Sequence, residues 1–352
     1  MSDSSTERGA PSQASAETPR TAREVSDRGR LFLENKGVEE ARLDAELLVA
    51  HALGMDRLGL FMTLDRPVAE EELRRARELL VRRGKGEPVA YLTGEREFFG
   101  RAFHVGAGCL IPRPETEHLI DEARRWWQER TGSSAVQRDL ALEASRQRAL
   151  AADHLSEQPD ADTEAVEAMS KEAPTPPAQS GPVVLDLGTG SGCLAITLAL
   201  ELEGASVTAV ERSAAALEWA RANARALGAE VCFEEGDALA FLGGLSAGSL
   251  DLVVSNPPYV DRKELPNLAR EVRDFEPAEA LLAPQGDVDF WVRELVQRVP
   301  ALLRAGGLLL IELGAEQGER ALALARAAAP CGARVEVLRD LAGLDRVLVL
   351  GA

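Results

Sequence analysis

The residues of this chain best suited to chemistry are Asn256, Pro257, Pro258 and Tyr259, which directly follow an apolar run. An amide or exocyclic amine nitrogen attacks poorly because its lone pair is delocalised. Two hydrogen-bond acceptors on its two N–H groups can hold such a nitrogen and aim the lone pair. The Asn256 side-chain oxygen and the Pro257 carbonyl are two such acceptors, and the Tyr259 ring offers a flat face. The alternative interpretation is a proline-rich turn that only ends a strand.

A second cluster is the glycine-rich loop at residues 188–192, which joins an apolar run to an expected helix at residues 193–202. Glycines allow a tight turn and a close approach of the backbone to a ligand. The spacing is GxGxG rather than GxGxxG, and Asp186 would repel a pyrophosphate. A carboxylate there suits a cationic ligand such as S-adenosylmethionine, with its sulfonium and amino groups. The predicted cofactor contacts in this cluster are Asp186, Gly188, Thr189, Gly190, Ser191 and Gly192.

Two further acids follow expected strands. Glu211 comes directly after a strand at residues 206–210, where a carboxylate can accept hydrogen bonds from both hydroxyls of a ribose. Asp237 follows a strand at residues 230–234 and is placed to meet an adenine amine. For each acid, a solvated loop position is the alternative interpretation.

The elements that must position these residues alternate between strand and helix from residue 183 to the end, which is typical of a doubly wound α/β sheet. The expected strands are residues 183–187, 206–210, 230–234, 250–255, 307–313, 334–338 and 346–350. Too few residues separate the last two for a crossover helix, so they should form an antiparallel hairpin. Ligands of such sheets bind at the carboxyl ends of the strands. Seven strands with this hairpin favour a methyltransferase sheet over a dinucleotide dehydrogenase.

Five segments are expected along the chain. Residues 1–23 predict a disordered tail without the apolar core of a secretory signal. Residues 24–87 carry apolar positions at helical spacing and predict a small helical domain, which either docks a substrate or only stabilises the chain. Residues 88–130 predict a β-hairpin over 88–105 and a connecting helix. Residues 131–181 predict a disordered acidic insert, and residues 182–352 form the α/β domain.

The stretch between hairpin and helix reads LIPRPETE, and its prolines force an extended path. Thr116 is expected to cap the following helix. Arg113, Glu115 and Glu117 either face the active site or belong to a plain linker.

The composition of the chain argues against several classes of function. The chain has 352 residues and a net charge of −18, which argues against a broad nucleic-acid-binding face. The four cysteines show no CxxC pairing, which is typical of a reducing cytoplasm, and the four histidines are dispersed, so no metal site is expected. No apolar run is long enough to span a membrane. A cytoplasmic monomer is expected.

Eight stretches together resemble the peptide chain release factor glutamine N5-methyltransferase family (HemK/PrmC type). They are ARLDAELLVAHAL, EPVAYLTGEREFFG, LIPRPETE, VLDLGTGSG, VVSNPPYV, EPAEAL, GGLLLIELGAEQG and DLAGLDRVLVL. The resemblance implies a seven-stranded Rossmann-like methyltransferase domain with a small amino-terminal helical domain. It also implies S-adenosylmethionine at the glycine loop, at Glu211 and at Asp237 and Ala238. The substrate it implies is the glutamine of the Gly-Gly-Gln loop of a release factor, held by Asn256 to Tyr259.

Three features depart from the family pattern. Glu211 stands where the family more often has Asp, and Ala238 stands where an aromatic residue often flanks the adenine. The insert at 131–181 is longer than the usual link.

The expected reaction is in-line methyl transfer to the glutamine nitrogen, with most of the rate coming from positioning. Asn256, Pro257 and Tyr259 are the expected catalytic residues. Asn256 also lies beside the cofactor, and Pro258 and Arg113 add to the substrate contacts. A DNA or RNA amine methyltransferase is the first alternative, which the acidic balance disfavours. A non-catalytic S-adenosylmethionine-binding scaffold is the second, and it has no need of the Asn-Pro-Pro-Tyr stretch.

Overall fold

The computed structural model describes residues 20–132 and 181–352, and the chain divides into two compact units between Thr93 and Gly94. The sequence predicts the end of the helical domain slightly earlier, at residue 87. The expected amino-terminal tail and the acidic insert lie almost wholly outside the described residues. Within the described ranges, every helix is too short or too polar to cross a membrane.

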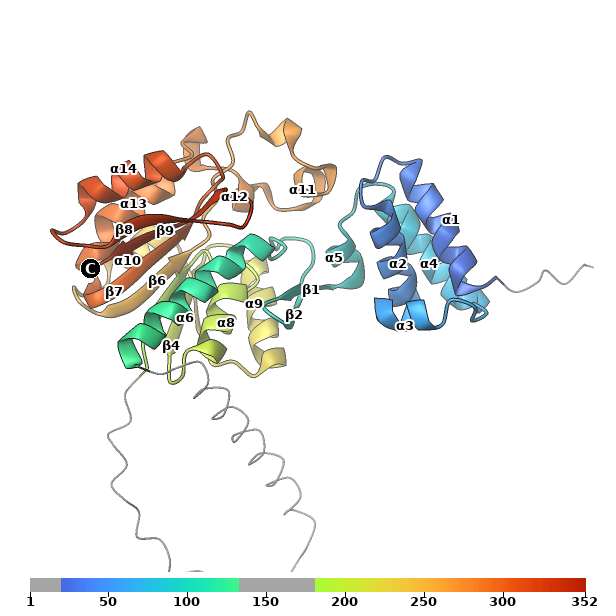
Figure 1. The fold of residues 1–352 in the computed structure, drawn as a ribbon, viewed down its shortest axis with the longest axis horizontal. Coiled ribbons are helices and arrows are strands. Elements are labelled where there is room, and N and C mark those ends of the chain that lie inside the picture. Colours follow the sequence, from blue (N-terminus) through green and yellow to red (C-terminus); the bar gives the residue numbers. More distant parts are fainter. Residues whose placement is uncertain (1–19, 133–180) are drawn as a thin grey trace, which may run out of the picture. The chain divides into compact units, whose positions relative to one another are not determined.

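The first unit is a bundle of short helices (Figure 1). They are α1 (Ala22–Glu34), α2 (Ala41–Ala52), α3 (Arg57–Met62), α4 (Glu70–Arg83) and α5 (Val89–Thr93). Apolar side chains at helical spacing, such as Leu33, Leu48 and Leu80, are buried together between these helices. A buried ion pair, from Arg83 Nε to Asp44 Oδ2 at 2.6 Å, joins α4 to α2. The predicted helical fold of this part of the chain is confirmed, while its docking role stays a prediction.

The hairpin predicted over residues 88–105 is too long, because α5 occupies its first part. Pro88 precedes α5, and proline favours the start of a helix because its φ is already helical. The strands of the hairpin are β1 (Glu95–Phe98) and β2 (Arg101–His104). Between them, Phe99 and Gly100 have φ of 51° and 71°, as the tight turn of a two-residue hairpin requires.

The second unit is built on a seven-stranded sheet with the order β5-β4-β3-β6-β7-β9-β8. Its strands are β3 (Val183–Leu187), β4 (Ser206–Glu211), β5 (Cys232–Glu235), β6 (Leu250–Ser255), β7 (Leu303–Glu312), β8 (Val335–Arg339) and β9 (Asp345–Gly351). The strands β3 to β7 pair in parallel, and β9 pairs antiparallel with both β7 and β8. The predicted sheet and its terminal antiparallel hairpin are therefore confirmed. Because β3, β4 and β6 are neighbours, their carboxyl ends meet at one edge of the sheet.

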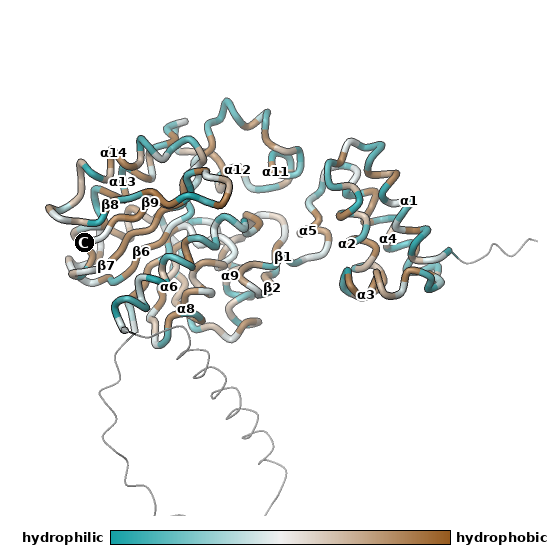
Figure 2. The backbone as a smooth tube through the Cα atoms, viewed as in Figure 1, coloured by the Kyte–Doolittle hydropathy of each residue, from teal (hydrophilic) through white to brown (hydrophobic). Residues whose placement is uncertain are grey.

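Helices cover both faces of this sheet (Figure 1). One face is covered by α6 (Glu117–Thr131), α8 (Cys193–Glu201) and α9 (Ala214–Leu227), and the other by α10 (Ala238–Gly243), α13 (Phe290–Arg298) and α14 (Gly318–Ala328). Successive strand residues alternate between the two cores. Val184 and Leu252 pack with the first group of helices, and Leu185 and Val253 with the second. Burial on both faces explains why the strands are almost continuously apolar, as the brown β6, β7 and β9 in Figure 2 show.

Short helical segments complete the second unit. They are η1 (Pro114–Thr116) before α6, then η3 (Leu265–Asn267), α11 (Arg270–Phe275), α12 (Ala278–Leu281) and η4 (Pro284–Gly286) between β6 and α13, and η5 (Val299–Ala301) after it. The chain leaving β6 is tied to this region through Val260. Its N–H donates to Leu281 O, and its carbonyl accepts from Ala283 N, both at 2.9 Å. These two bonds fix where the Asn-Pro-Pro-Tyr stretch ends.

Candidate active site

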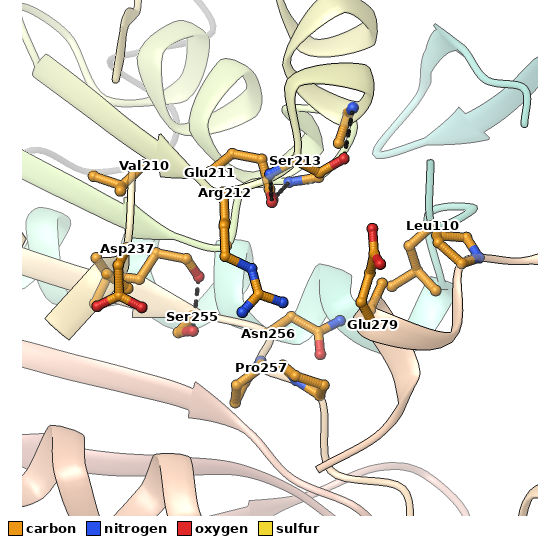
Figure 3. A pocket seen from close by; sticks show the side chains of 18 of the residues that line it. Leu110, Val210, Glu211, Arg212, Ser213, Asp237, Ser255, Asn256, Pro257 and Glu279 are labelled. Carbon is orange, nitrogen blue, oxygen red and sulfur yellow. Dashed lines mark hydrogen bonds between the residues drawn. The ribbon is translucent and has the colours of Figure 1, made fainter. Parts of the chain in front are cut away.

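A cavity of about 360 Å³ lies at the carboxyl ends of β3, β4 and β6 (Figure 3). The predicted site residues that line it are Gly188, Gly190, Glu211, Asp237, Ala238, Asn256, Pro257 and Pro258. The predicted site residues outside its lining are Asp186, Thr189, Ser191, Gly192, Tyr259 and Arg113. The fold thus brings residues of all three motifs to one cavity, while the other predicted residues lie outside its lining.

The glycine loop needs its glycines for two different reasons. Gly188, Gly190 and Gly192 have φ of 75°, 56° and 82°, a region that residues with a Cβ rarely adopt. A Cβ on Gly192 would lie 2.8 Å from Ile196 Cδ1, so this glycine lets the loop pack against α8. A Cβ on Gly188 or Gly190 would meet no protein atom within 4 Å, and both residues face the cavity. Those two positions leave space for a ligand.

Asp186 lies at the end of β3 and is fully buried. Its Oδ2 accepts hydrogen bonds from Thr189 Oγ1 at 2.6 Å and from Ala195 N at 3.2 Å. Burial raises the pKa of this carboxyl to about 7, although both hydrogen bonds oppose the rise. Within the described chain its Oδ1 has no hydrogen-bond partner. An acceptor left unsatisfied beside the glycine loop suits a ligand that carries a positive charge or N–H groups.

Glu211, at the end of β4, joins two backbone segments of the site. Its Oε2 accepts from Gly190 N and its Oε1 from Ser213 N, both at 2.9 Å. An ionised carboxylate offers about four acceptor positions, so each oxygen can accept one more donor. The longer Glu side chain thus reaches the glycine loop and still presents acceptors at the cavity.

Asp237 begins α10 and has a structural role that the sequence reasoning missed. Its Oδ1 accepts from the backbone N–H groups of Leu239 and Ala240 at 3.0 and 2.9 Å, which caps the helix. Both Asp237 and its neighbour Ala238 line the cavity, and Ala238 contributes only a methyl group there. The predicted contact of Asp237 with an adenine amine stays a prediction.

The Asn-Pro-Pro-Tyr stretch directly follows β6, which lies beside β3, the strand before the glycine loop. Ser255 Oγ donates to Leu187 O at 2.8 Å and thereby joins the ends of β6 and β3. The next residue, Asn256, donates from Nδ2 to Thr116 Oγ1 at 3.1 Å. Pro257, like Asn256, lines the cavity in Figure 3. The amide of Asn256 is therefore held at the cavity by a residue from η1.

Thr116 stands at the N-cap position of α6, as expected, but the predicted capping hydrogen bond is absent. Its side chain makes no capping bond, because η1 runs straight into α6 and Thr116 already has helical φ and ψ of −65° and −21°. Its hydroxyl instead donates to Glu312 Oε2 at 2.6 Å. Glu312 ends β7 and is only 2% exposed. Thr116 therefore links the active-site asparagine to a buried carboxylate.

Tyr259 is not among the residues that line the cavity. Its hydroxyl lies 3.4 Å from Glu312 Oε1 and donates to it. Its ring packs on Gly314, where an added Cβ would lie 3.1 Å from Tyr259 Cδ2. Burial raises the pKa of the Tyr259 phenol, so the hydroxyl stays protonated as a donor. The expected stacking of this ring on a substrate amide stays a prediction.

Arg113 forms an ion pair rather than reaching the cavity. Its Nη2 lies 2.5 Å from Glu276 Oε1, and the other oxygen of Glu276 accepts from Ile111 N at 3.0 Å. This carboxylate clamps the segment before η1 to the segment before α12. The predicted substrate contact of Arg113 stays a prediction. Glu117, also considered for the site, accepts from Phe99 N at 2.9 Å and supports the hairpin instead.

Sequence reasoning missed several polar residues of the site. Arg212 and Glu279 line the cavity and project into it in Figure 3. Glu279 belongs to the stretch EPAEAL and Arg212 directly follows Glu211, so both positions carried a signal. Glu312 stands at the end of an apolar strand, as the predicted acid Glu211 does, and the same rule would have singled it out.

The comparisons with known proteins agree with this arrangement. Residues 24–94 match the model of the PrmC N-terminal domain, and residues 166–307 match that of the Methyltransferase small domain. The chain is 38% identical over 322 residues to the release factor glutamine methyltransferase of Nitratidesulfovibrio vulgaris, covering 91% of each protein. It is 36% identical over 328 residues to that of Geobacter sulfurreducens, covering 93% of this chain and 95% of the relative. It is 39% identical over 320 residues to that of Chlorobaculum tepidum, covering 90% and 92%.

These relatives are similar to the chain along nearly its whole length, through both units and the cavity between the strand ends. The chain therefore belongs to the release factor glutamine methyltransferase family.

Proposed function

We propose that this chain transfers a methyl group from S-adenosylmethionine to the side-chain nitrogen of the glutamine in the Gly-Gly-Gln loop of a peptide chain release factor. The observation that carries this proposal is the 3.1 Å hydrogen bond from Asn256 Nδ2 to Thr116 Oγ1. Because this bond turns the Asn256 nitrogen toward Thr116, the oxygen Oδ1 remains for a substrate. An oxygen acceptor at this point suits the N–H group of an amide substrate. Membership in the family supports the choice of glutamine.

The cavity residues fit S-adenosylmethionine. The unsatisfied Oδ1 of Asp186 and the glycine loop suit its positively charged part, and Glu211 keeps acceptor capacity for the ribose hydroxyls. Asp237 is assigned to the adenine amine. Because Gly190 has no side chain, the space beside it is open to a ligand. When bound, the cofactor supplies an electrophilic methyl group.

The residues of the chain act mainly by positioning. Asn256 Oδ1 and the Pro257 carbonyl accept the two N–H groups of the glutamine amide, hold its nitrogen and aim the lone pair. The same two oxygens stabilise the nitrogen as it becomes positive, which favours the transition state over the ground state. The excess proton then leaves to water.

We further propose that the protein acts as a cytoplasmic monomer without nucleic-acid or membrane partners. The net charge of −18 supports the absence of a nucleic-acid face, and the lack of CxxC pairing among the four cysteines supports a reducing compartment. The helical unit of α1 to α5 is proposed to dock the release factor.

The test is mass spectrometry of an intact release factor after incubation with this protein and isotope-labelled S-adenosylmethionine. Label on the glutamine of the Gly-Gly-Gln loop is expected. A release factor with a Gly-Gly-Ala loop and a DNA duplex serve as controls. Label on the loop mutant at equal yield, or on DNA adenine, would show that the substrate is a different one.

A further inference from the structure

A line of hydrogen bonds runs from the cavity into the interior of the second unit. Asn256 Nδ2 donates to Thr116 Oγ1 at 3.1 Å, and Thr116 Oγ1 donates to Glu312 Oε2 at 2.6 Å. Thr116 and Glu312 are each only 2% exposed, so bulk water cannot replace either partner. Three elements far apart in the sequence, the end of β6, η1 and the end of β7, thus meet in one line.

The direction of this line decides which end of the Asn256 amide faces the cavity. A hydroxyl has a single proton. While Thr116 gives that proton to the Glu312 carboxylate, its oxygen can only accept from Asn256, so Asn256 must offer its nitrogen to Thr116. Oδ1 is then the end left for the substrate.

Protonation of Glu312 removes this constraint. With the proton on Oε2, the Thr116 hydroxyl loses its acceptor and is free to donate to an Asn256 amide turned the other way. The Asn256 NH₂ group would then face the N–H group of the glutamine amide, which sets a donor against a donor.

We propose that Thr116 and Glu312 are positioning residues of the methyl transfer, and that the Glu312 carboxylate, acting through the Thr116 hydroxyl, fixes the Asn256 amide with its oxygen toward the substrate nitrogen. This inference rests on the proposed function. The second carboxylate oxygen, Oε1, accepts from Tyr259 Oη at 3.4 Å. One buried carboxylate therefore holds both polar side chains of the Asn-Pro-Pro-Tyr stretch.

The surroundings of Glu312 let its charge change in an accessible pH range. The titratable and charged groups that face it are Glu115 of η1, Tyr259 after β6, Cys193 of α8 and Arg346 of β9. Burial raises the pKa of the Glu312 carboxyl to about 7, and the charge of Glu115 adds to this. The hydrogen bonds from Thr116 and Tyr259 and the charge of Arg346 oppose the rise. Above neutral pH, the Glu312 carboxylate is therefore ionised and the line of hydrogen bonds from Asn256 is complete. Below neutral pH, Glu312 is protonated and Thr116 loses its acceptor.

The first measurement is single-turnover transfer to an intact release factor, at saturating labelled cofactor, across neutral pH. The wild-type rate should rise with pH with a midpoint near 7, and Glu312→Gln should lose this dependence. Saturating cofactor keeps Asp186, whose pKa burial also raises to about 7, from governing the rate. A flat wild-type profile, or the same profile in Glu312→Gln, overturns the inference.

Substitutions at Thr116 separate positioning from packing. Thr116→Val keeps the shape and removes the hydroxyl, so the transfer rate should fall by about 10²-fold, as expected for a misplaced reactive group, with an unchanged cofactor dissociation constant. Thr116→Ser should restore most of the rate. The matched control is Thr197→Val, because Thr197 is also fully buried and its Oγ1 makes no hydrogen bond to any described residue. A wild-type rate in Thr116→Val overturns the inference, as does a loss of similar size in Thr197→Val.

A second readout does not depend on turnover. The side-chain amide ¹⁵N–¹H signals of Asn256 should shift with a midpoint near pH 7 in the wild type and stay fixed in Glu312→Gln. Signals that do not titrate in the wild type overturn the inference. If the wild type transfers the methyl group and Thr116→Val does so at the same rate, only the role of Thr116 and Glu312 is refuted. No transfer to any release factor at any pH defeats the proposed function and this inference together.

Discussion

Gly190 contributes to the site through the side chain that it lacks. It lines the cavity with a φ of 56°, and a Cβ added to it would meet open space rather than protein. Gly190→Val should therefore abolish S-adenosylmethionine binding, since the branched side chain fills the ligand space and strains the loop. Calorimetry on the folded variant measures this.

Gly228 offers a matched control for Gly190. It has a φ of 67° and open space around its hydrogen, but it ends α9 away from the cavity lining. Gly228→Val should carry similar backbone strain and retain cofactor affinity. Undiminished affinity in Gly190→Val would remove the glycine loop from the binding site.

Substitutions at Asn256 should separate cofactor binding from methyl transfer. Asn256→Ala should keep cofactor binding, because the glycine loop and Glu211 contribute from other strands, but lose transfer to the glutamine. Removing one preorganised polar group where charge develops costs on the order of 10²–10³ in rate. Asn256→Asp should also be poor, because it keeps the shape but buries a charge beside an amide. Single-turnover transfer at wild-type rate in Asn256→Ala would refute the role of the whole Asn-Pro-Pro-Tyr stretch.

At the scale of elements, the strand β7 ends in a carboxylate whose burial costs stability. The pKa of Glu312 is raised from 4.5 to about 7, so the folded chain binds this proton more tightly than the unfolded chain. Its contribution to the free energy of unfolding is therefore fully present below pH 4.5 and is lost as the pH rises through about 7. The loss is on the order of 3 kcal/mol, from the free energy of about 1.4 kcal/mol per pKa unit.

Glu312→Gln should remove this pH dependence. Denaturant unfolding between acidic and mildly alkaline pH should show the wild type losing more stability with rising pH than the variant does. Glu316→Gln, an exposed position shortly after β7, is the control and should behave as the wild type. A wild type and a Glu312→Gln variant with parallel stability profiles would contradict the raised pKa.

Elements with a strong local pattern could be predicted, and contacts between distant elements could not. The β-branched and leucine runs of β3, β4 and β6 mark buried parallel strands, and the acid or amide after each run marks the ligand edge. The partners of Asn256 and Thr116 lie 140 and 196 residues away in the chain, so no local spacing reports them. The local sequence around Thr116 predicts a capping hydrogen bond, but a tertiary contact of its hydroxyl overrides that preference.

At the scale of the whole molecule, the alternation of strands and helices suffices to predict the sheet and its terminal hairpin. The prediction follows because parallel neighbours need a crossover helix and the last two strands are too close for one. The division between Thr93 and Gly94 was less accessible, because α5 is a short helix next to a hairpin, and both share the same apolar and glycine-rich stretch. Single-turn elements carry too few residues for a periodic signal.

Replacing the insert at residues 131–181 would test whether the stability and activity of the second unit depend on this segment. Its composition, rich in Ala, Glu, Asp, Ser and Pro, predicts little apolar burial. Both flanks are anchored within the described unit, since Trp126 Nε1 of α6 donates to Gly306 O and Val183 N of β3 donates to Asp251 Oδ2, both at 2.9 Å. Replacing residues 133–180 by a Gly/Ser linker should therefore keep the Tm within about 2 °C and the transfer rate near wild type, because loop closure depends weakly on length. Calorimetry and the single-turnover assay check both, and a large drop in Tm would show that the insert packs on the domain.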